Sequence, residues 1–354
     1  MIKFLKRVKH YFIYLRNCTK QLKAKTSYDS IPYPPHRSSF LLLKTLGDKN
    51  KDKTFYLIDT PNFNNYGYFA IIRYIASSMI VCLKTGAIPH VVVRKSRYNN
   101  VEGDNMFENY FIQPSGFTTE EVMQSYNVII HNVKHIDLIE ELNTNHPNLT
   151  NGYVISDEYI NLMGQICNKY IKLRSDIEEK LSEQINNLLS NKEKTIGIHY
   201  RGNAFKIGLK YHPVVLTIED YYPFIDKCLE NGFEKIFLAT DEEQTIEKVR
   251  EKYGDKVLFY NDTFRSSNGF DIHEQVIERE NNNFLIGYEA LRDMLTLSYC
   301  GALVCGLSQL SIMARIFKSS RNEKYQFLQL INKGFNEKTN KKVVNEYDKK
   351  RRKM

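Results

Sequence analysis

The sequence lacks the short motifs that usually mark a nucleotide or metal site. Neither GxxxxGKS nor GxxxxGKT occurs, which excludes a P-loop, and the absence of GxGxxG argues against a dinucleotide oxidoreductase. There is no DxD triplet to hold Mg²⁺ or Mn²⁺ beside a diphosphate. Tryptophan is absent, and the six cysteines form no CxxC pair and no Cys–His cluster. Because most of these cysteines lie in apolar runs, we expect reduced thiols in the core of a cytoplasmic protein.

A long apolar run is also missing from the N-terminal segment. Residues 1–26 carry eight Lys or Arg side chains and no acid, and their longest apolar run, Tyr11–Leu15, is too short to span a bilayer or to serve as a signal peptide. Aromatic side chains are interleaved with these charges. The segment therefore predicts peripheral docking on an anionic membrane, such as the inner membrane face, with a merely solvated basic arm as the alternative.

Positive charge is concentrated at both ends of the chain. Residues 337–354 hold eight basic and three acidic side chains, so the two termini account for more than the whole net charge of +9. The body of the chain is left mildly acidic, at about −4. A nucleic-acid-binding surface across the body is therefore not predicted.

The length of 354 residues allows two domains, each with its own core. Apolar residues recur at steps of three and four over 157–190, which predicts one long helix that links the domains. We expect a basic N-terminal arm, a first Rossmann-like domain that ends in this linker helix, a second domain and a basic C-terminal tail, with bounds at 1–50, 51–192, 193–335 and 336–354.

The first domain opens with a strand, a loop and a helix. The strand is predicted at Thr54–Asp59, and the apolar helix at 69–85, where Gly86 ends it. The loop between them contains Asn65 and Gly67. A loop of this kind can bring backbone N–H groups to a ligand, although a glycine in a tight turn more often serves the turn itself.

The second domain alternates strands and helices, which predicts an α/β fold with a parallel, doubly wound sheet. The predicted strands are 195–199, 235–240, 256–260 and 302–306, and the predicted helices are 218–231, 242–253, 287–300 and 308–317. Ligands of such sheets bind beyond the carboxyl ends of the strands.

Four polar residues fall at these carboxyl ends, namely His199, Arg201, Asp241 and Ser308. Arg201 offers a planar fork of donors that suits a diphosphate. Ser308 and Gln309 open a helix whose free N–H groups favour a phosphate. Asp241 has a structural alternative, because it could cap the helix that follows it.

Asp293 lies in a predicted helix among apolar neighbours, so its carboxylate requires a partner. A guanine edge would supply two donors, N1–H and N2–H₂. A nearby arginine or backbone amide is the alternative, and the sequence alone favours it.

Three segments carry a specific resemblance. IGIHYRGN, FLATD and DMLTLSYCGALVCGLSQLSIMA resemble, in order and spacing, the motifs of the α-1,6-fucosyltransferase family. FNNYGYFAIIRYIASSMIVCLKTGAIPHVVV and MFENYFIQPSG resemble its N-terminal domain more loosely. The resemblance spans about residues 54–320 and is strongest over 195–315.

The resemblance implies a GT-B glycosyltransferase, with two Rossmann-like domains facing a cleft. Its donor would be GDP-β-L-fucose and its acceptor a glycan hydroxyl, with inversion at the anomeric carbon and no metal or other cofactor. Matched motif by motif, His199 would contact the nucleoside, Arg201 the pyrophosphate and Asp293 the guanine. The remaining donor-binding candidates are Asn203, Asp241, Ser308, Gln309, Asn65 and Gly67.

Two departures from the family pattern keep alternatives open. Relatives carry a proton-accepting carboxylate in the loop after the His-x-Arg motif, but no acid lies between Arg201 and Glu219 here. The candidate replacements are His212, Asp271 and Glu274. The last motif reads LSQ where relatives commonly have two serines. A transferase for another sugar nucleotide, an inactive nucleotide-binding relative and a membrane-associated scaffold are the alternatives, and the polar set at the strand ends disfavours the scaffold.

Overall fold

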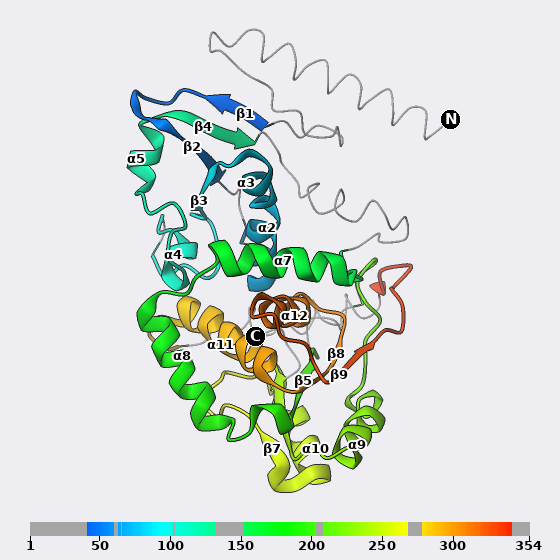
Figure 1. Ribbon diagram of the computed structural model, residues 1–354. Coiled ribbons are helices and arrows are strands. Elements are labelled where there is room, and N and C mark those ends of the chain that lie inside the picture. The colour runs from blue at the N-terminus through cyan, green and yellow to red at the C-terminus, as the bar shows by residue number, and fades with distance from the viewer. Residues whose placement is uncertain are drawn as a thin grey trace, which may run out of the picture. The chain divides into compact units, whose positions relative to one another are not determined.

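The computed structural model describes residues 41–59, 63–64, 66–101, 103–131, 152–202, 208–267 and 278–341. These residues form two compact units (Figure 1). The first holds the described residues as far as His131 together with Lys169–Arg174, and the second holds residues 152–168 and those from Ser175 onward. The basic N-terminal segment lies outside the described residues, as do four of the predicted site residues: Asn65, Asn203, Asp271 and Glu274.

The first unit is built on a four-stranded sheet with the strand order β1-β4-β2-β3. Its strands are β1 (Leu41–Lys44), β2 (Lys49–Asp59), β3 (Ile88–Val92) and β4 (Ser125–His131). β2 runs parallel to β3 and β4, whereas β1 is antiparallel to β4. The predicted strand over 54–59 is therefore confirmed within β2, and the parallel core has an antiparallel strand at one edge.

The helices of the first unit are short. They are α2 (Tyr68–Ser78), α3 (Ile80–Thr85), α4 (Met106–Tyr110) and α5 (Thr119–Met123). The apolar segment over 69–85 thus forms two helices instead of one, and Gly86 ends the second with φ of 71°, as predicted. Tyr68–Thr85 is long and apolar enough to cross a membrane, but 78% of it is buried within the protein, so its apolar side chains are used in packing.

The prediction of one long helix over 157–190 is wrong. The chain forms α7 (Asp157–Tyr170) and α8 (Ser175–Leu188), and the residues between them pair with another segment. Ile112 donates its N–H to the carbonyl of Lys172 at 2.8 Å, and Arg174 donates to the carbonyl of Tyr110 at 3.0 Å. These contacts distant in sequence interrupt a pattern that is continuous by local periodicity.

The second unit carries a five-stranded parallel sheet with the order β7-β6-β5-β8-β9. Its strands are β5 (Thr195–Tyr200), β6 (Lys235–Thr240), β7 (Val257–Leu258), β8 (Ala302–Gly306) and β9 (Phe327–Ile331). The connecting helices are α9 (Tyr222–Glu230), α10 (Glu243–Tyr253), α11 (Asn282–Tyr299) and α12 (Gln309–Ser320). The doubly wound sheet is confirmed, and its winding direction reverses between β5 and β8.

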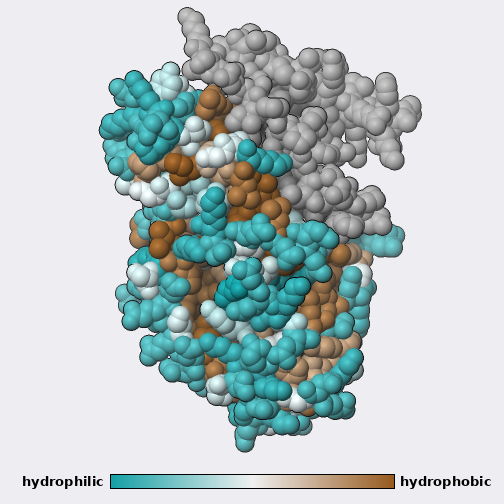
Figure 2. All heavy atoms as spheres, in the orientation of Figure 1, coloured by the Kyte–Doolittle hydropathy of each residue, from teal (hydrophilic) through white to brown (hydrophobic). Residues whose placement is uncertain are grey.

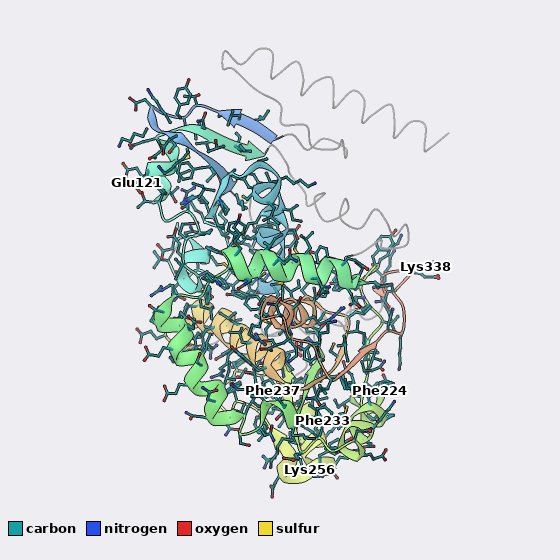
Figure 3. The ribbon with its side chains drawn as sticks, viewed as in Figure 1. Glu121, Phe224, Phe233, Phe237, Lys256 and Lys338 are labelled. Carbon is teal, nitrogen blue, oxygen red and sulfur yellow. The ribbon has the colours of Figure 1, made fainter. Side chains whose placement is uncertain are left out.

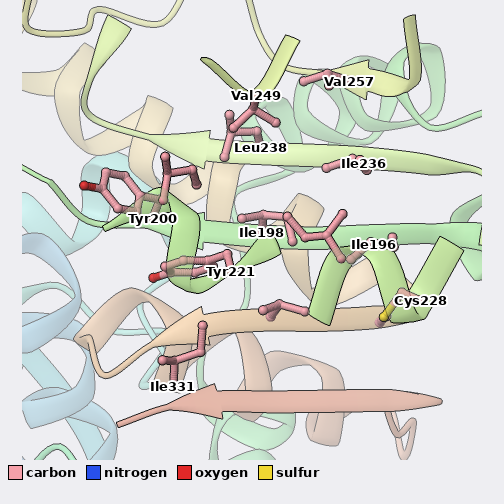
Figure 4. Packing of buried hydrophobic residues seen from close by; sticks show 14 of the residues in the cluster. Ile196, Ile198, Tyr200, Tyr221, Cys228, Ile236, Leu238, Val249, Val257 and Ile331 are labelled. Atoms are coloured by element: carbon pink, nitrogen blue, oxygen red, sulfur yellow. The ribbon is translucent and has the colours of Figure 1, made fainter. Parts of the chain in front are cut away.

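The core of this unit explains why β5 lies at its centre. Ile196, Ile198 and Tyr200 alternate along β5 and pack on one face with Ile236 and Leu238 of β6, as Figure 4 shows. Every residue of β5 is buried, as expected for a strand with parallel neighbours on both sides. Phe237 of β6 is likewise fully buried, whereas Phe224 and Phe233 are only partly buried (Figure 3).

The units divide the chain at other points than the predicted boundaries. Residues 157–168 and α8 belong to the second unit, although we expected them in the first domain. α8 buries Ile177, Leu181 and Ile185, and the surface over it is hydrophilic in Figure 2. At the other end, part of the predicted tail is paired, since Asn340 donates its N–H to the carbonyl of Gly208 at 3.0 Å.

Candidate active site

His199 reaches the carboxyl edge of the sheet from β5. Along this strand it shares its face with Gly197, opposite the isoleucines of the core described above. A Cβ at Gly197 would lie 2.9 Å from a methyl group of Leu297, so the glycine allows α11 to pack closely on this face. His199 is 4% exposed and stands two residues before Arg201, which follows the end of the strand.

The imidazole of His199 meets the first turn of α12. Its Nδ1 lies 3.1 Å from Oγ of Ser308, and Ser308 is the N-cap residue of that helix. The same Oγ accepts the backbone N–H of Ser311 at 3.0 Å. Burial, and secondarily the charge of Arg201, lowers the pKa of His199 to about 3, so the ring is neutral at physiological pH.

Tyr221 bridges β5 and β8 where the two strands separate. The ladder between them ends at the pair His199 and Cys305. Beyond it, the Tyr221 hydroxyl donates to the carbonyl of His199 at 3.2 Å and accepts the N–H of Gly306 at 3.1 Å. A Cβ at Gly306 would lie 2.8 Å from Leu216 and 3.1 Å from this hydroxyl. The buried hydroxyl of Tyr221 therefore links the two strands at the switch point, where their direct pairing ends.

Arg201 and Asp241 lie together at the ends of β5 and β6. Nε of Arg201 is 3.7 Å from Oδ2 of Asp241, and Oδ1 of Asp241 accepts the N–H of Gly202 at 3.0 Å. The alternative that Asp241 caps α10 is wrong, because Glu242 occupies the N-cap position. Glu242 is buried, and its carboxylate fills the space that a Cβ at Gly202 would need. The two residues that follow β5, Arg201 and Gly202, are thus in contact with two acids at the end of β6.

A pocket opens at the carboxyl ends of β5, β8 and β9. The residues that line it are His199, Arg201, Pro213, Val214, Leu216, Tyr221, Gly306, Leu307, Ser308, Ile331, Asn332, Lys333 and Gly334. Three of the sequence-predicted residues are therefore brought together here, and each comes from a strand end. A second cation in this lining, Lys333, binds Asp220 with Nζ 2.6 and 2.7 Å from the two carboxylate oxygens.

Asp293 does not line this pocket. It is buried in α11, and its Oδ1 has no hydrogen-bond partner among the residues that the structure describes. Burial raises the pKa of Asp293 to about 7, and the nearby charges of Arg265 and Arg292 partly oppose that effect. The predicted alternative, in which an arginine or an amide satisfies this carboxylate, is not what the described residues show.

The other predicted site residues that the structure describes, His212, Gln309 and Gly67, do not line the pocket. His212 is half-buried, with its ring centroid 6.2 Å from that of Tyr153, and burial lowers its pKa; it is not part of the pocket lining. Gln309 is the first residue of α12, beside Ser308. Gly67 precedes α2 with φ of −68°, and a Cβ there would meet nothing within 4 Å, so neither backbone strain nor packing requires a glycine.

The remaining reactive groups are the side chains that could bind a metal ion and the thiols of the cysteines. Within the described ranges, no three His, Cys, Asp or Glu side chains gather as a metal site. Five cysteines are free and buried, namely Cys82, Cys167, Cys228, Cys300 and Cys305, which confirms the predicted core thiols for these positions.

Three residues of this edge were missed by the sequence analysis. Tyr221 gave no signal, because its role depends on two strands that separate in space. Lys333 follows β9, a strand that we did not predict. Glu242 stands directly after Asp241, so the pair of acids at the end of a strand was a visible signal.

Comparisons with known proteins give one family match and several similar solved structures. The sequence pattern of "Alpha-(1,6)-fucosyltransferase N- and catalytic domains" matches residues 146–324, half of the chain and all three strand-end motifs. The crystal structure of NodZ alpha-1,6-fucosyltransferase co-crystallized with GDP aligns with a TM-score of 0.43 and 15% identity, over 75% of this chain and 92% of that one. NodZ comes from Bradyrhizobium. POFUT1 in complex with GDP-fucose aligns with a TM-score of 0.44 and 10% identity, over 80% and 99%. No curated protein sequence matches this chain.

The family match defines the class of protein. The matched residues include His199, Arg201, Asp241, Asp293 and Ser308. The match shows that the protein is a glycosyltransferase. The chain belongs to the alpha-(1,6)-fucosyltransferase family.

Proposed function

We propose that the protein transfers L-fucose from GDP-β-L-fucose to a hydroxyl group of a glycan, with inversion and without a metal ion. The observation that carries the proposal is the convergence of Arg201, His199 and Ser308 on one pocket at the switch point of the second sheet. GDP and GDP-fucose are the compounds named with the NodZ and POFUT1 crystal structures, which supports this choice of donor.

Arg201 would act on the leaving group. As the bond between fucose and diphosphate breaks, negative charge develops on the phosphate oxygens, and a fixed guanidinium stabilises this charge more in the transition state than in the ground state. Asp241 would keep Arg201 in place, since its carboxylate contacts the guanidinium and accepts the N–H of the neighbouring Gly202. The N-terminal turn of α12, next to Ser308, adds backbone N–H groups and a favourable helix dipole.

Neutral His199 and buried Asp293 would recognise the nucleoside. Ser308 contacts the imidazole at Nδ1, so Nε2 would be the nitrogen that contacts the nucleoside. The unpartnered Oδ1 of Asp293 suits the N1–H and N2–H₂ donors of guanine. The base that accepts the proton of the acceptor hydroxyl stays a prediction, with His212 and Glu274 as its candidates.

The experiment is a transfer assay with GDP-fucose and a panel of glycan acceptors. Transfer increases the acceptor mass by one deoxyhexose and releases an equal amount of GDP. NMR of the product gives the anomeric configuration, and an α-fucoside is expected. GDP binding without transfer to any acceptor of the panel would favour the inactive relative, and transfer from GDP-mannose alone would contradict the proposed donor.

A further inference from the structure

Among the described charged side chains near Asp293, two form no ion pair, namely Asp293 itself and one arginine, and Nε of Arg292 is a further buried donor without a partner among the described residues. Arg279 and Glu289 form a two-point ion pair with N–O distances of 2.5 and 3.1 Å. Arg292 and Asp262 form another, with distances of 2.9 and 2.6 Å. Neither an ion pair nor a hydrogen bond joins Asp293 to any described residue. The arginine without an ion pair lies in the loop after β7.

This arginine, Arg265, is fixed on one side and unsatisfied on the other. Its Nη1 donates to the carbonyls of Tyr260 at 2.8 Å and Thr263 at 3.2 Å, and its guanidinium carbon lies 5.5 Å from the ring centre of Phe259. Nε and Nη2 are buried and have no hydrogen-bond partner among the described residues. These two nitrogens direct their hydrogens to the same side of the planar group, so they form an intact two-donor fork.

The segments that carry the fork and the carboxylate contact each other through Tyr260. The carbonyl of Tyr260 accepts a hydrogen bond from Arg265, and the hydroxyl of Tyr260 lies 2.9 Å from Oγ1 of Thr296, which follows Asp293 by three residues in α11. Each of the two charges is also the largest one that offsets the effect of burial on the pKa of the other group. The backbone of Ser266, next to Arg265, pairs with Asp241 and Glu243 at the end of β6. A buried carboxyl group and a buried guanidinium thus lie on neighbouring segments, and neither a hydrogen bond nor an ion pair between them is present. Such groups are costly to bury unless a ligand satisfies both.

We propose that Arg265 is a specificity-determining residue that donates its Nε and Nη2 hydrogens to O6 and N7 of a guanine base whose N1–H and N2–H₂ face Asp293. The inference rests on the proposed function. Guanine presents acceptors on one edge and donors on the adjacent edge, which matches one donor fork and one carboxylate. Adenine places an N6–H₂ donor where O6 would be, against the donors of Arg265, so this site rejects it.

The test removes single atoms from the base and from the protein. Calorimetric titrations compare GDP with 7-deaza-GDP, which lacks the N7 acceptor, and with IDP, which lacks the N2 amine. The proteins are wild type, Arg265→Met, Arg265→Lys, Asp293→Asn and the control Arg250→Met. Arg250 is an exposed arginine whose guanidinium lies 5.7 Å from the same Phe259 ring, so its replacement reproduces the loss of one cation beside that ring.

We expect wild type and Arg250→Met to bind 7-deaza-GDP about tenfold more weakly than GDP, within the range for half of a two-point contact. In Arg265→Met this ratio falls to about one, while the preference for GDP over IDP persists. Arg265→Lys keeps the charge but lacks the two-donor fork, so it also loses most of the preference for GDP over 7-deaza-GDP. In Asp293→Asn the preference for GDP over IDP is lost instead. Circular dichroism checks the fold of each variant.

Two results would overturn the inference, and they are distinguishable. If wild type binds GDP but Arg265→Met and Arg265→Lys discriminate against 7-deaza-GDP as wild type does, Arg265 does not contact N7. If wild type binds no guanine nucleotide, the proposed function fails and the inference fails with it.

Discussion

The hydroxyl of Ser308 lies 3.1 Å from Nδ1 of His199 and joins the first turn of α12 to the last residues of β5. One serine side chain therefore has two tasks, since it also caps α12 through the N–H of Ser311. The stability of the helix and the orientation of the imidazole depend on the same atom. A change at Ser308 is expected to affect folding and binding together.

Ser308→Ala is expected to lower the free energy of unfolding by about 1 kcal/mol, the usual cost of losing a helix cap. It is also expected to weaken GDP binding about tenfold, because His199 loses the group that orients it. Thr118→Ala is the matched control, since Thr118 caps α5 of the first unit together with Glu121 (Figure 3). Urea unfolding and calorimetry measure both effects. Equal GDP affinities in the two variants would show that the contact between Ser308 and His199 has no role in binding.

Arg201→Ala is expected to lower kcat/KM for GDP-fucose by about two to three powers of ten, the range for losing one preorganised electrostatic contact. Arg201→Lys should recover little, because lysine lacks the planar fork. Lys333→Ala serves as the control, since this exposed cation of the same pocket is already paired with Asp220. The fold of each variant is checked by circular dichroism. A folded Arg201→Ala enzyme with near-wild-type turnover would show that the motif is structural.

Asp293 predicts an unusual dependence of stability on pH. Its pKa is raised by burial to about 7, so the folded protein retains this proton at pH values where the unfolded chain has lost it. The contribution of Asp293 to the free energy of unfolding therefore falls as the pH rises from 5 to 7 and becomes level as the pH passes about 8. Asp293→Asn lacks this decline, and we expect it to gain at most about 3 kcal/mol on wild type between pH 5 and pH 8.

The same variant is expected to lose GDP affinity at every pH, while wild type binds GDP more weakly as the pH falls below 7. Urea unfolding and calorimetry at pH 5, 6, 7 and 8 test both statements. A stability difference between wild type and Asp293→Asn that does not change with pH would show that Asp293 is charged throughout this range.

The basic N-terminal segment, which lies outside the described residues, is proposed to hold the enzyme on anionic membranes. Its eight basic side chains contribute at most about 1 kcal/mol each near such a surface. We expect the full chain to sediment with vesicles that contain phosphatidylserine, and the binding to weaken in high salt. A chain that starts at Thr26 is the comparison, and equal sedimentation of the two proteins would contradict the proposal.

Prediction from the sequence was most successful for strands that are covered on both faces of the sheet. β5, β6 and β8 read as short apolar runs because parallel strands are covered by helices on both faces, and the polar residues that follow them mark the carboxyl edge. This placed His199, Arg201 and Ser308 correctly around one pocket.

The wrong or missing predictions concern places where contacts between segments distant in the sequence determine the structure. The break between α7 and α8 follows from pairing of residues 171–174 with 110–112, which local periodicity cannot reveal. The alternative role of Asp241 as a helix cap is wrong for the same reason, since in the folded chain its carboxylate accepts the N–H of Gly202. Arg265 was not singled out at all, because an unsatisfied donor is visible only when all of its neighbours are placed.

The most direct test of the account is a calorimetric titration of the wild-type protein with GDP-fucose, GDP, ADP and UDP in the presence of excess EDTA. The account predicts that GDP-fucose and GDP bind, that ADP and UDP bind at least tenfold more weakly, and that added Mn²⁺ changes none of these affinities. Equal binding of GDP, ADP and UDP, or binding of GDP-fucose only after Mn²⁺ is restored, would contradict a metal-independent GDP-fucose site built from Arg201, His199 and Asp293.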